Sequence, residues 1–259
     1  MQAAELEYLR CPVCRGVLAA SAAALPCDGC GASYPVEDGI PRLLRPGSAA
    51  ELAAQIAALD ADMRRHDWVV AKMSLATLRW IPAERNRLLG EIGIEPGWAV
   101  LDHCTGPGSN LPALAKAVGA GGRLTAMDLS PFVLGRAAEL ARRRRIEVAL
   151  HQADALALPY AERSFDAVVH YGALNQFAPN IAAAIAEIVR VTRPGGLVVL
   201  LDEGIEERRR AGRWGRLLMR ANPLFASLPP LDLLPAGVEP RVRWVIRGMF
   251  YEVRFRTPC

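Results

Sequence analysis

The sequence has few lysines and no long apolar run. Lys72 and Lys116 are the only lysines, so arginine supplies almost all of the positive charge, and the formal net charge is only +4. So small a charge permits an acidic partner but does not by itself indicate nucleic-acid binding. No segment approaches the roughly 18 consecutive apolar residues of a membrane-spanning helix, so we expect no transmembrane segment.

The first residues also lack the charge pattern that is typical of a signal peptide. The first residues, MQAAELEYLRCP, carry acids where a signal peptide carries bases, and we therefore expect a cytoplasmic protein. The length of 259 residues suits one full α/β domain plus a small module. Pro46-Gly47 and a change of composition at Ser48 mark the boundary, so the predicted units are residues 1–47 and 48–259.

Four cysteines form two close pairs near the start of the chain. Cys11 and Cys14 form one C-x2-C pair, and Cys27 and Cys30 form another after twelve intervening residues. Each pair can offer two thiolates to one ion from a tight turn, and two pairs complete a closed tetrahedral site. In a chain with no secretion signal this spacing favours zinc over disulfides or unrelated thiols. Four thiolates leave no open position, so this zinc would be structural.

The same segment resembles a known family. LRCPVCRGVL and LPCDGCGASYPVEDGIPRLL are similar to the small zinc-ribbon proteins that activate several tRNA- and ribosome-modifying methyltransferases. The resemblance covers about residues 6–45, and YPVEDGIPRLL is characteristic of that family. It implies that the N-terminal module is a zinc ribbon and leaves open what the ribbon contacts.

Short apolar strands alternate with helices after Gly97. This alternation indicates a parallel sheet that is covered on both faces. The tail PRVRWVIRGMFYEVRFR predicts a closing antiparallel hairpin around Gly248. Upstream, residues 48–96 are predicted to be helical, with one helix at about 48–62 and a second at about 67–92 that is interrupted near Pro82.

A Gly-rich turn follows the first strand of this alternating region. WAVLD ends in Asp102, and HCTGPG then runs directly into a predicted helix. Small residues let the backbone approach a ligand closely, and ligands bind beyond the carboxyl ends of strands in open α/β sheets. Asp128 ends the next strand, where a carboxylate can accept hydrogen bonds from ribose hydroxyls. Nucleotide-dependent dehydrogenases have the same arrangement of a Gly-rich turn and a following acidic strand end, so the turn alone does not identify the ligand.

Two further segments carry a specific resemblance. QADALALPYAERSFDAVVHYGAL and EIVRVTRPGGLVVLLDEG resemble the class I, Rossmann-like S-adenosylmethionine-dependent methyltransferases over about residues 84–203. The resemblance implies an α/β fold with a seven-stranded, mostly parallel sheet. It also implies that Asp102 lies by the methionine moiety, Asp128 holds the ribose and Asp154-Ala155 lie at the adenine ring. The residues predicted to bind S-adenosylmethionine are Asp102, His103, Cys104, Gly106, Gly108, Asp128, Leu129, Asp154, Ala155 and His170.

The chain departs from this family at two places. Cys104 stands where the family usually has the first glycine of its turn; we expect cofactor binding to survive and Cys104 to be a small buried filler. Many small-molecule relatives have a histidine near position 175 or 176, whereas this chain has Asn175 and Gln176. His170 and Tyr171 are the catalytic candidates that remain. His170 would act as a general base, or it would only pack beside the cofactor. Tyr171 would orient a hydroxyl group of the substrate, or it would only form part of the pocket wall.

Residues 206–236 form the predicted substrate lid and mix arginines with large apolar residues. They are interpreted as a solvated basic helix over an apolar lid, as a lid for a bulky apolar substrate that contacts a membrane surface, or as an RNA contact. We predict methyl transfer to a small, apolar or aromatic metabolite, because LAKMSLATLRWIPAE is similar to the quinone C-methyltransferases. An RNA base methyltransferase and a non-methylating cofactor-binding protein are the alternatives. The sequence does not indicate the oligomeric state.

Overall fold

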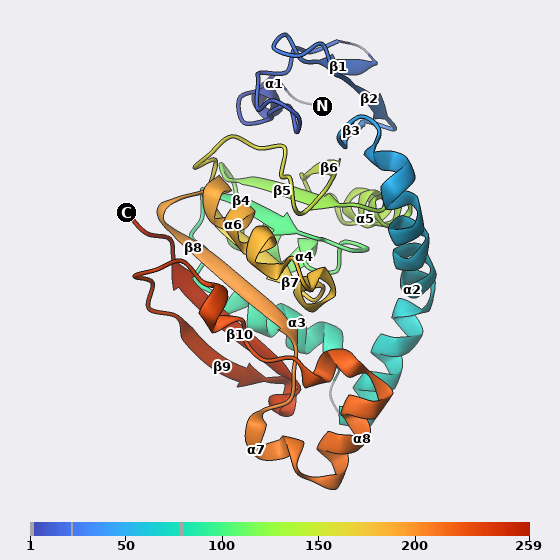
Figure 1. The fold of residues 1–259 in the computed structure, drawn as a ribbon, viewed down its shortest axis with the longest axis vertical. Helices are drawn as coiled ribbons and strands as arrows, with labels where there is room; N and C mark the ends of the chain where they lie inside the picture. Colours follow the sequence, from blue (N-terminus) through green and yellow to red (C-terminus); the bar gives the residue numbers. More distant parts are fainter. Residues whose placement is uncertain (1–2, 22, 78–79) are drawn as a thin grey trace.

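A single sheet organises the molecule (Figure 1). This computed structural model describes residues 3–21, 23–77 and 80–259. The ten strands lie in the order β1-β2-β3-β6-β5-β4-β7-β8-β10-β9. Strands β4 to β8 are parallel, and β10 and β9 close the sheet as an antiparallel hairpin. The predicted α/β fold, with seven strands from β6 to β9, is therefore confirmed. The strands are β1 Ala24–Pro26, β2 Ser33–Glu37, β3 Ile40–Leu43, β4 Ala99–His103, β5 Arg123–Asp128, β6 Ala149–Ala153, β7 Phe165–Tyr171, β8 Thr192–Glu203, β9 Arg241–Val245 and β10 Phe250–Arg256.

Helices cover both faces of this sheet. In β4, Val100 packs into the core cluster that contains helices α3, α4 and α5, while the next residue, Leu101, packs into the cluster that contains α6. This alternation is the period-two pattern of a strand that is buried on both sides. The helices are α1 Ala3–Leu6, α2 Ser48–Thr77, α3 Ile81–Gly90, α4 Leu111–Val118, α5 Pro131–Arg144, α6 Ile181–Val191, α7 Glu207–Arg210 and α8 Arg213–Ala221. None of those described has the length and apolarity to span a bilayer.

Helix α2 corrects the predicted helical boundaries. It is continuous over Ser48–Thr77, so the predicted break between residues 62 and 67 was wrong. The segment Met63–His66 contains neither glycine nor proline, and nothing in it stops a helix. The next helix, α3, begins at Ile81 with Pro82 in its first turn, a position where the missing N–H costs no hydrogen bond. The interruption near Pro82 is therefore confirmed.

The N-terminal module extends the sheet. Strand β3 pairs with β6 in parallel, with Arg42 opposite Gln152 and Leu43 opposite Ala153, and β2 and β1 continue antiparallel beyond it. The buried side chains of this module, including Tyr8, Leu25 and Tyr34, belong to the same core cluster as α6. The sequence predicted the module but not that its strands join the central sheet.

Candidate functional site

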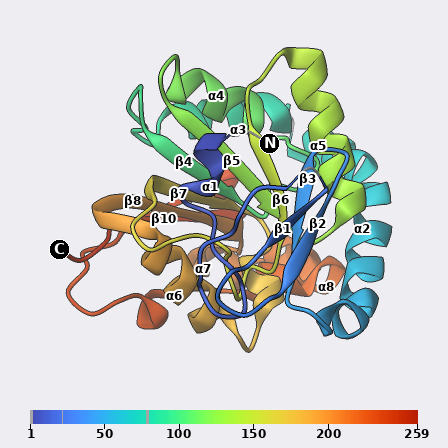
Figure 2. The same ribbon diagram turned by 90° about the horizontal axis from the view of Figure 1, so that it is seen from above.

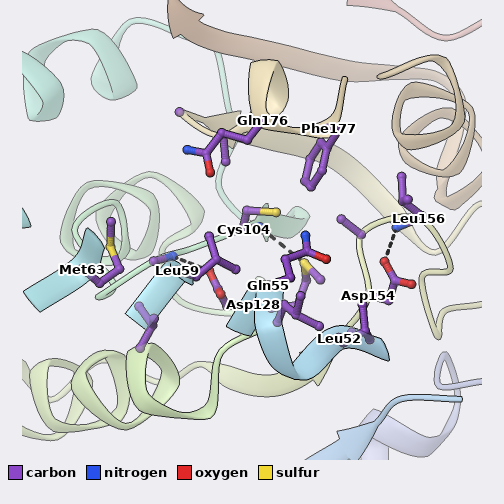
Figure 3. A pocket seen from close by; sticks show the side chains of 18 residues that line it. Leu52, Gln55, Leu59, Met63, Cys104, Asp128, Asp154, Leu156, Gln176 and Phe177 are labelled. Carbon is purple, nitrogen blue, oxygen red and sulfur yellow. Dashed lines mark hydrogen bonds between the residues drawn. The ribbon is translucent and has the colours of Figure 1, made fainter. Parts of the chain in front are cut away.

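A cavity lies across the carboxyl ends of β4, β5 and β6. Asp128 is the last residue of β5, and Asp154 comes directly after β6. Helix α2 crosses the cavity (Figure 3). Gln176 and Phe177 form the opposite wall in the same view. The lining residues are Leu52, Gln55, Leu59, Met63, Cys104, Gly106, Met127, Asp128, Leu129, Val133, Ala153, Asp154, Ala155, Leu156, Gly172, Ala173, Gln176 and Phe177.

Both carboxylates in this wall are held by backbone groups. Asp128 accepts hydrogen bonds from the N–H of Gly106 at 2.9 Å and of Ser130 at 3.1 Å. Burial raises the pKa of Asp128, although those backbone bonds favour the ionised form. Asp154 accepts a bond from the N–H of Leu156 at 2.8 Å. Two fixed acceptors thus stand at neighbouring strand ends, beside the apolar side chains of Ala155 and Leu156.

Asp102 lies beneath the turn and not in the cavity wall. It is fully buried, and it accepts hydrogen bonds from Thr105 Oγ1 at 2.6 Å and Asn110 Nδ2 at 2.9 Å. Burial raises its pKa to about 6, against the opposing effect of those two bonds. Asn110 stands at the start of α4, so Asp102 ties the Gly-rich turn to the helix that follows it.

The Gly-rich turn needs unusual backbone angles. Cys104 has a φ of 59°, in the left-handed region that glycine adopts most easily, which accounts for the glycine usual there. Gly108 has a φ of 81°, and a Cβ there would lie 2.9 Å from Leu111 Cδ1 and 3.1 Å from Ala137. Gly108 therefore serves close packing behind the turn, whereas Cys104 and Gly106 line the cavity.

The structure brings His103 and His170 together but away from the cavity. Both are fully buried, and their Nδ1 atoms lie 2.7 Å apart. Burial lowers the pKa of His103 to about 4 and that of His170 well below its usual value. Neither ring lines the cavity described above. This placement favours the packing interpretation of His170 over the role of a general base.

A second cavity adjoins the first and contains Tyr171. The two cavities share Met63, Cys104, Gly106, Gly172 and Gln176 as lining residues. Among the residues that the structure describes, three buried polar atoms at this second cavity have no hydrogen-bond partner: Arg85 Nε, Tyr171 Oη and Glu203 Oε2. The Arg85 guanidinium also lies 4.5 Å from the centre of the Tyr171 ring. The remaining lining residues are Ile81, Thr105, Pro107, Asn110, Ile246 and Phe250.

Asn175, which stands near the family's histidine position, braces the loop after β7. Its backbone N–H donates to Asp202 at 2.8 Å, its Nδ2 donates to the Glu203 carbonyl at 2.8 Å, and its Oδ1 accepts from Tyr251 Oη at 3.0 Å. Asp202 is fully buried by this network. Of the residues described between 206 and 236, the predicted lid, none lines either cavity.

Helix α2 supplies the cavity residues that sequence reasoning missed. Leu52, Gln55, Leu59 and Met63 recur every three or four positions and so share one face of a helix. The pattern was present in the Ala-rich stretch, but nothing in it indicates that the stretch returns over strand ends more than forty residues away.

The four N-terminal cysteines converge. Their Sγ atoms all lie within 4.8 Å of one another, with Cys11 and Cys30 at 3.6 Å and Cys14 and Cys27 at 3.4 Å. Thiolates in a tetrahedral zinc site, each about 2.3 Å from the metal, stand about 3.8 Å apart. A Cβ on Gly16 would lie 3.1 Å from Cys14 Sγ, so glycine leaves room for the sulfurs. The group therefore fits a closed zinc site.

Comparison with known proteins agrees with this geometry. Residues 100–196 match the family described as a methyltransferase domain. This part of the chain is similar to a methyltransferase domain. The match begins in β4, includes both acidic strand ends of the first cavity and stops inside β8.

Relatives extend the comparison in part. The demethylmenaquinone methyltransferase of Staphylococcus aureus strain MRSA252 is 37% identical over 119 residues, which is 46% of this chain and 48% of that protein. The chain thus spans about half the length of this curated relative.

Solved structures share the fold. A SAM-dependent methyltransferase from Aquifex aeolicus superposes with a TM-score of 0.51 at 22% identity, over 67% of this chain and 89% of that one. A chain from a complex containing the Haloferax volcanii Trm112 methyltransferase activator has a TM-score of 0.51 at 19% identity, over 82% and 98%.

Proposed function

We propose that the protein transfers a methyl group from S-adenosylmethionine to a small, apolar or aromatic metabolite. The observation that carries the proposal is the pair of adjoining cavities, one with fixed carboxylates at the ends of β5 and β6 and the other with unpartnered polar atoms. S-adenosylmethionine supplies an electrophilic methyl group on a positively charged sulfur. The chain's own task is then to bind, align and exclude water.

The first cavity would hold the cofactor. Asp128 is oriented by Gly106 and Ser130 to accept ribose hydroxyls, and Ala155 and Leu156 offer apolar surface for the adenine ring. Cys104 and Gly106 bring the turn backbone to the same cavity. Asp102, His103, Gly108 and His170 would act from behind this wall by holding the turn and the strand ends.

The second cavity would hold the acceptor. Apolar side chains of Ile81, Ile246 and Phe250 suit a hydrophobic ring, and Tyr171 and Glu203 could bond a hydroxyl group on it. Glu203, whose carboxylate lines this cavity, would be the group that takes a proton from such a hydroxyl. The similarity to a relative named for demethylmenaquinone supports an acceptor of this kind.

The four cysteines would bind one structural Zn²⁺. Their sulfur separations fit a tetrahedral thiolate site, and a module of this size has too little core of its own to fold without such a crosslink.

The cofactor assignment is tested at Asp128. Asp128→Ala removes the charged acceptor for ribose, and each such hydrogen bond contributes roughly 1.5–3 kcal/mol, so the affinity for S-adenosylmethionine should fall about tenfold or more by calorimetry. The affinity of Asp128→Asn should fall less, because the amide oxygen of asparagine still accepts a hydrogen bond. Glu162→Ala, which removes an exposed carboxylate, is the matched control. Unchanged affinity in Asp128→Ala would remove the ribose assignment.

The acceptor class is tested separately. We expect the protein to methylate phenolic or quinol-like compounds with little dependence on salt. Tight binding of bulk cellular RNA that weakens steeply with salt, with no binding of such compounds, would favour the RNA alternative, because phosphate contacts release counterions. Cofactor binding with no turnover across both classes would favour a non-methylating protein.

A further inference from the structure

Helix α8 packs against the body by one side only. Gly215 is buried, and Leu218 and Met219 pack against the main core. At 100° per residue, these three positions share one face of the helix. The opposite face carries Arg213, Trp214, Arg216, Leu217 and Arg220, which we call the arginine–tryptophan face. Trp214 is 75% exposed and Leu217 is 54% exposed. Two large apolar side chains of this helix therefore lie in solvent and do not contribute to its packing against the body.

The arginines of this face are free of acidic partners. In the described part of the chain, Arg213, Arg216 and Arg220 have no carboxylate within ion-pair distance, whereas the nearby Arg208 and Arg209 both pair with Glu206. From residue 206 to 220 the sequence has six arginines and two acids. The face thus combines uncompensated positive charge with an exposed indole and a leucine.

More apolar surface lies at the same end of the molecule. In Figure 1, α8 and the C-terminal part of α2 both lie at the end opposite the N-terminal strands. Leu75, near the end of α2, is 77% exposed, and Trp80, just before α3, is 65% exposed. Trp80 directly precedes Ile81, which lines the second cavity. Large exposed apolar side chains gathered on one side of a protein mark an interaction surface.

We propose that the arginine–tryptophan face docks the protein on an anionic membrane surface. A helix with arginines beside tryptophan and leucine is suited to lie in the interface plane, with its apolar side chains among the lipids and its guanidinium groups on the phosphates. The charge of this face favours a membrane over a second copy of this chain. A second copy would present the same three arginines and repel the first, whereas an anionic lipid surface complements them. This docking does not depend on methyl transfer, and it is measured without cofactor.

Co-sedimentation with vesicles tests the proposal. The protein should bind vesicles that contain phosphatidylglycerol, bind pure phosphatidylcholine vesicles much more weakly, and dissociate as salt rises. Replacing Arg213, Arg216 and Arg220 together with Gln should weaken binding roughly 100-fold, since each basic residue near such a surface contributes about 1 kcal/mol. Replacing Trp214 and Leu217 together with Ser should weaken it about tenfold or more. Circular dichroism checks that both variants fold.

The matched control carries the same charge change elsewhere. Arg142, Arg143 and Arg144 are exposed at the end of α5, and their joint replacement by Gln should leave vesicle binding within about twofold. The proposal is overturned if the protein ignores anionic vesicles, or if the α5 variant loses as much binding as the α8 variant. It is also overturned if the Trp214 and Leu217 double variant changes a dimer to a monomer in light scattering without changing vesicle binding.

Discussion

At the scale of single residues, the pair His103 and His170 depends on both rings being neutral. Their Nδ1 atoms lie 2.7 Å apart, so one ring donates and the other accepts. Burial lowers the pKa of His103 to about 4, while an unfolded histidine takes up its proton near 6.5. Between these two values the unfolded chain binds more protons than the folded one. The stability that depends on this pair is therefore lost as the pH falls from about 6.5 to about 4.

Substitution of His103 should flatten this pH dependence. The amide of His103→Asn can still bond His170 but does not titrate. On acidification from about pH 7 to about pH 4, the free energy of unfolding of the wild type should fall by on the order of 3 kcal/mol more than that of the variant. Taking the difference cancels the buried acids Asp102 and Asp128, whose raised pKa values act in the opposite direction. Chemical denaturation at several pH values measures it, and a difference that does not change with pH would contradict the prediction.

At the scale of elements, the sequence predicted the features that depend on interactions between residues close in the chain. The alternating apolar strands, the cap of α5 by Ser130, which accepts from Val133 N–H at 3.1 Å, and the turn at Gly106 follow from residues close in sequence. Two features could not be predicted in this way. The pairing of β3 with β6 joins segments about a hundred residues apart, and α2 reaches the cavity through tertiary contacts such as Ser130 Oγ with Asp60. His170 shows the same limit, because the sequence gives its position at a strand end but not which way its ring points.

The role of α2 as a cavity wall can be tested on the helix itself. Leu59 lines the first cavity, while Ile56, one turn earlier, is also half-buried but does not. Leu59→Ala should weaken S-adenosylmethionine binding about tenfold, because burying a leucine side chain contributes roughly 1.5–3 kcal/mol. Ile56→Ala makes a similar loss of volume and should leave the affinity within about twofold. Calorimetry compares the two, and equal losses would indicate that α2 acts through general stability.

At the scale of the whole molecule, the cysteine module contacts the stretch of chain that leads away from the wall of the first cavity. Arg15 donates to the Leu158 carbonyl at 2.7 Å and pairs with Glu187, whose carboxylate also accepts from the Leu158 N–H at 2.7 Å. The backbone of Tyr8 accepts from Ala161 N–H at 2.8 Å. This stretch begins at Asp154 in the cavity wall, and α2 starts directly after the module and crosses the same cavity. The module is therefore connected to the first cavity in two ways, through the stretch after β6 that it contacts and through α2, which follows β3.

Loss of the metal should consequently weaken cofactor binding. Elemental analysis of the wild type should find one zinc per chain, and Cys27→Ser should lose it. Without the metal, the turn that holds Arg15 is no longer fixed, so the affinity for S-adenosylmethionine should fall about tenfold, within the usual range of coupling between two sites. Cys259→Ser makes the same change at an exposed cysteine outside the cluster and should keep both zinc and affinity. A zinc-free Cys27→Ser protein that binds the cofactor as tightly as the wild type would show that cofactor binding does not depend on the metal-bound fold of the module.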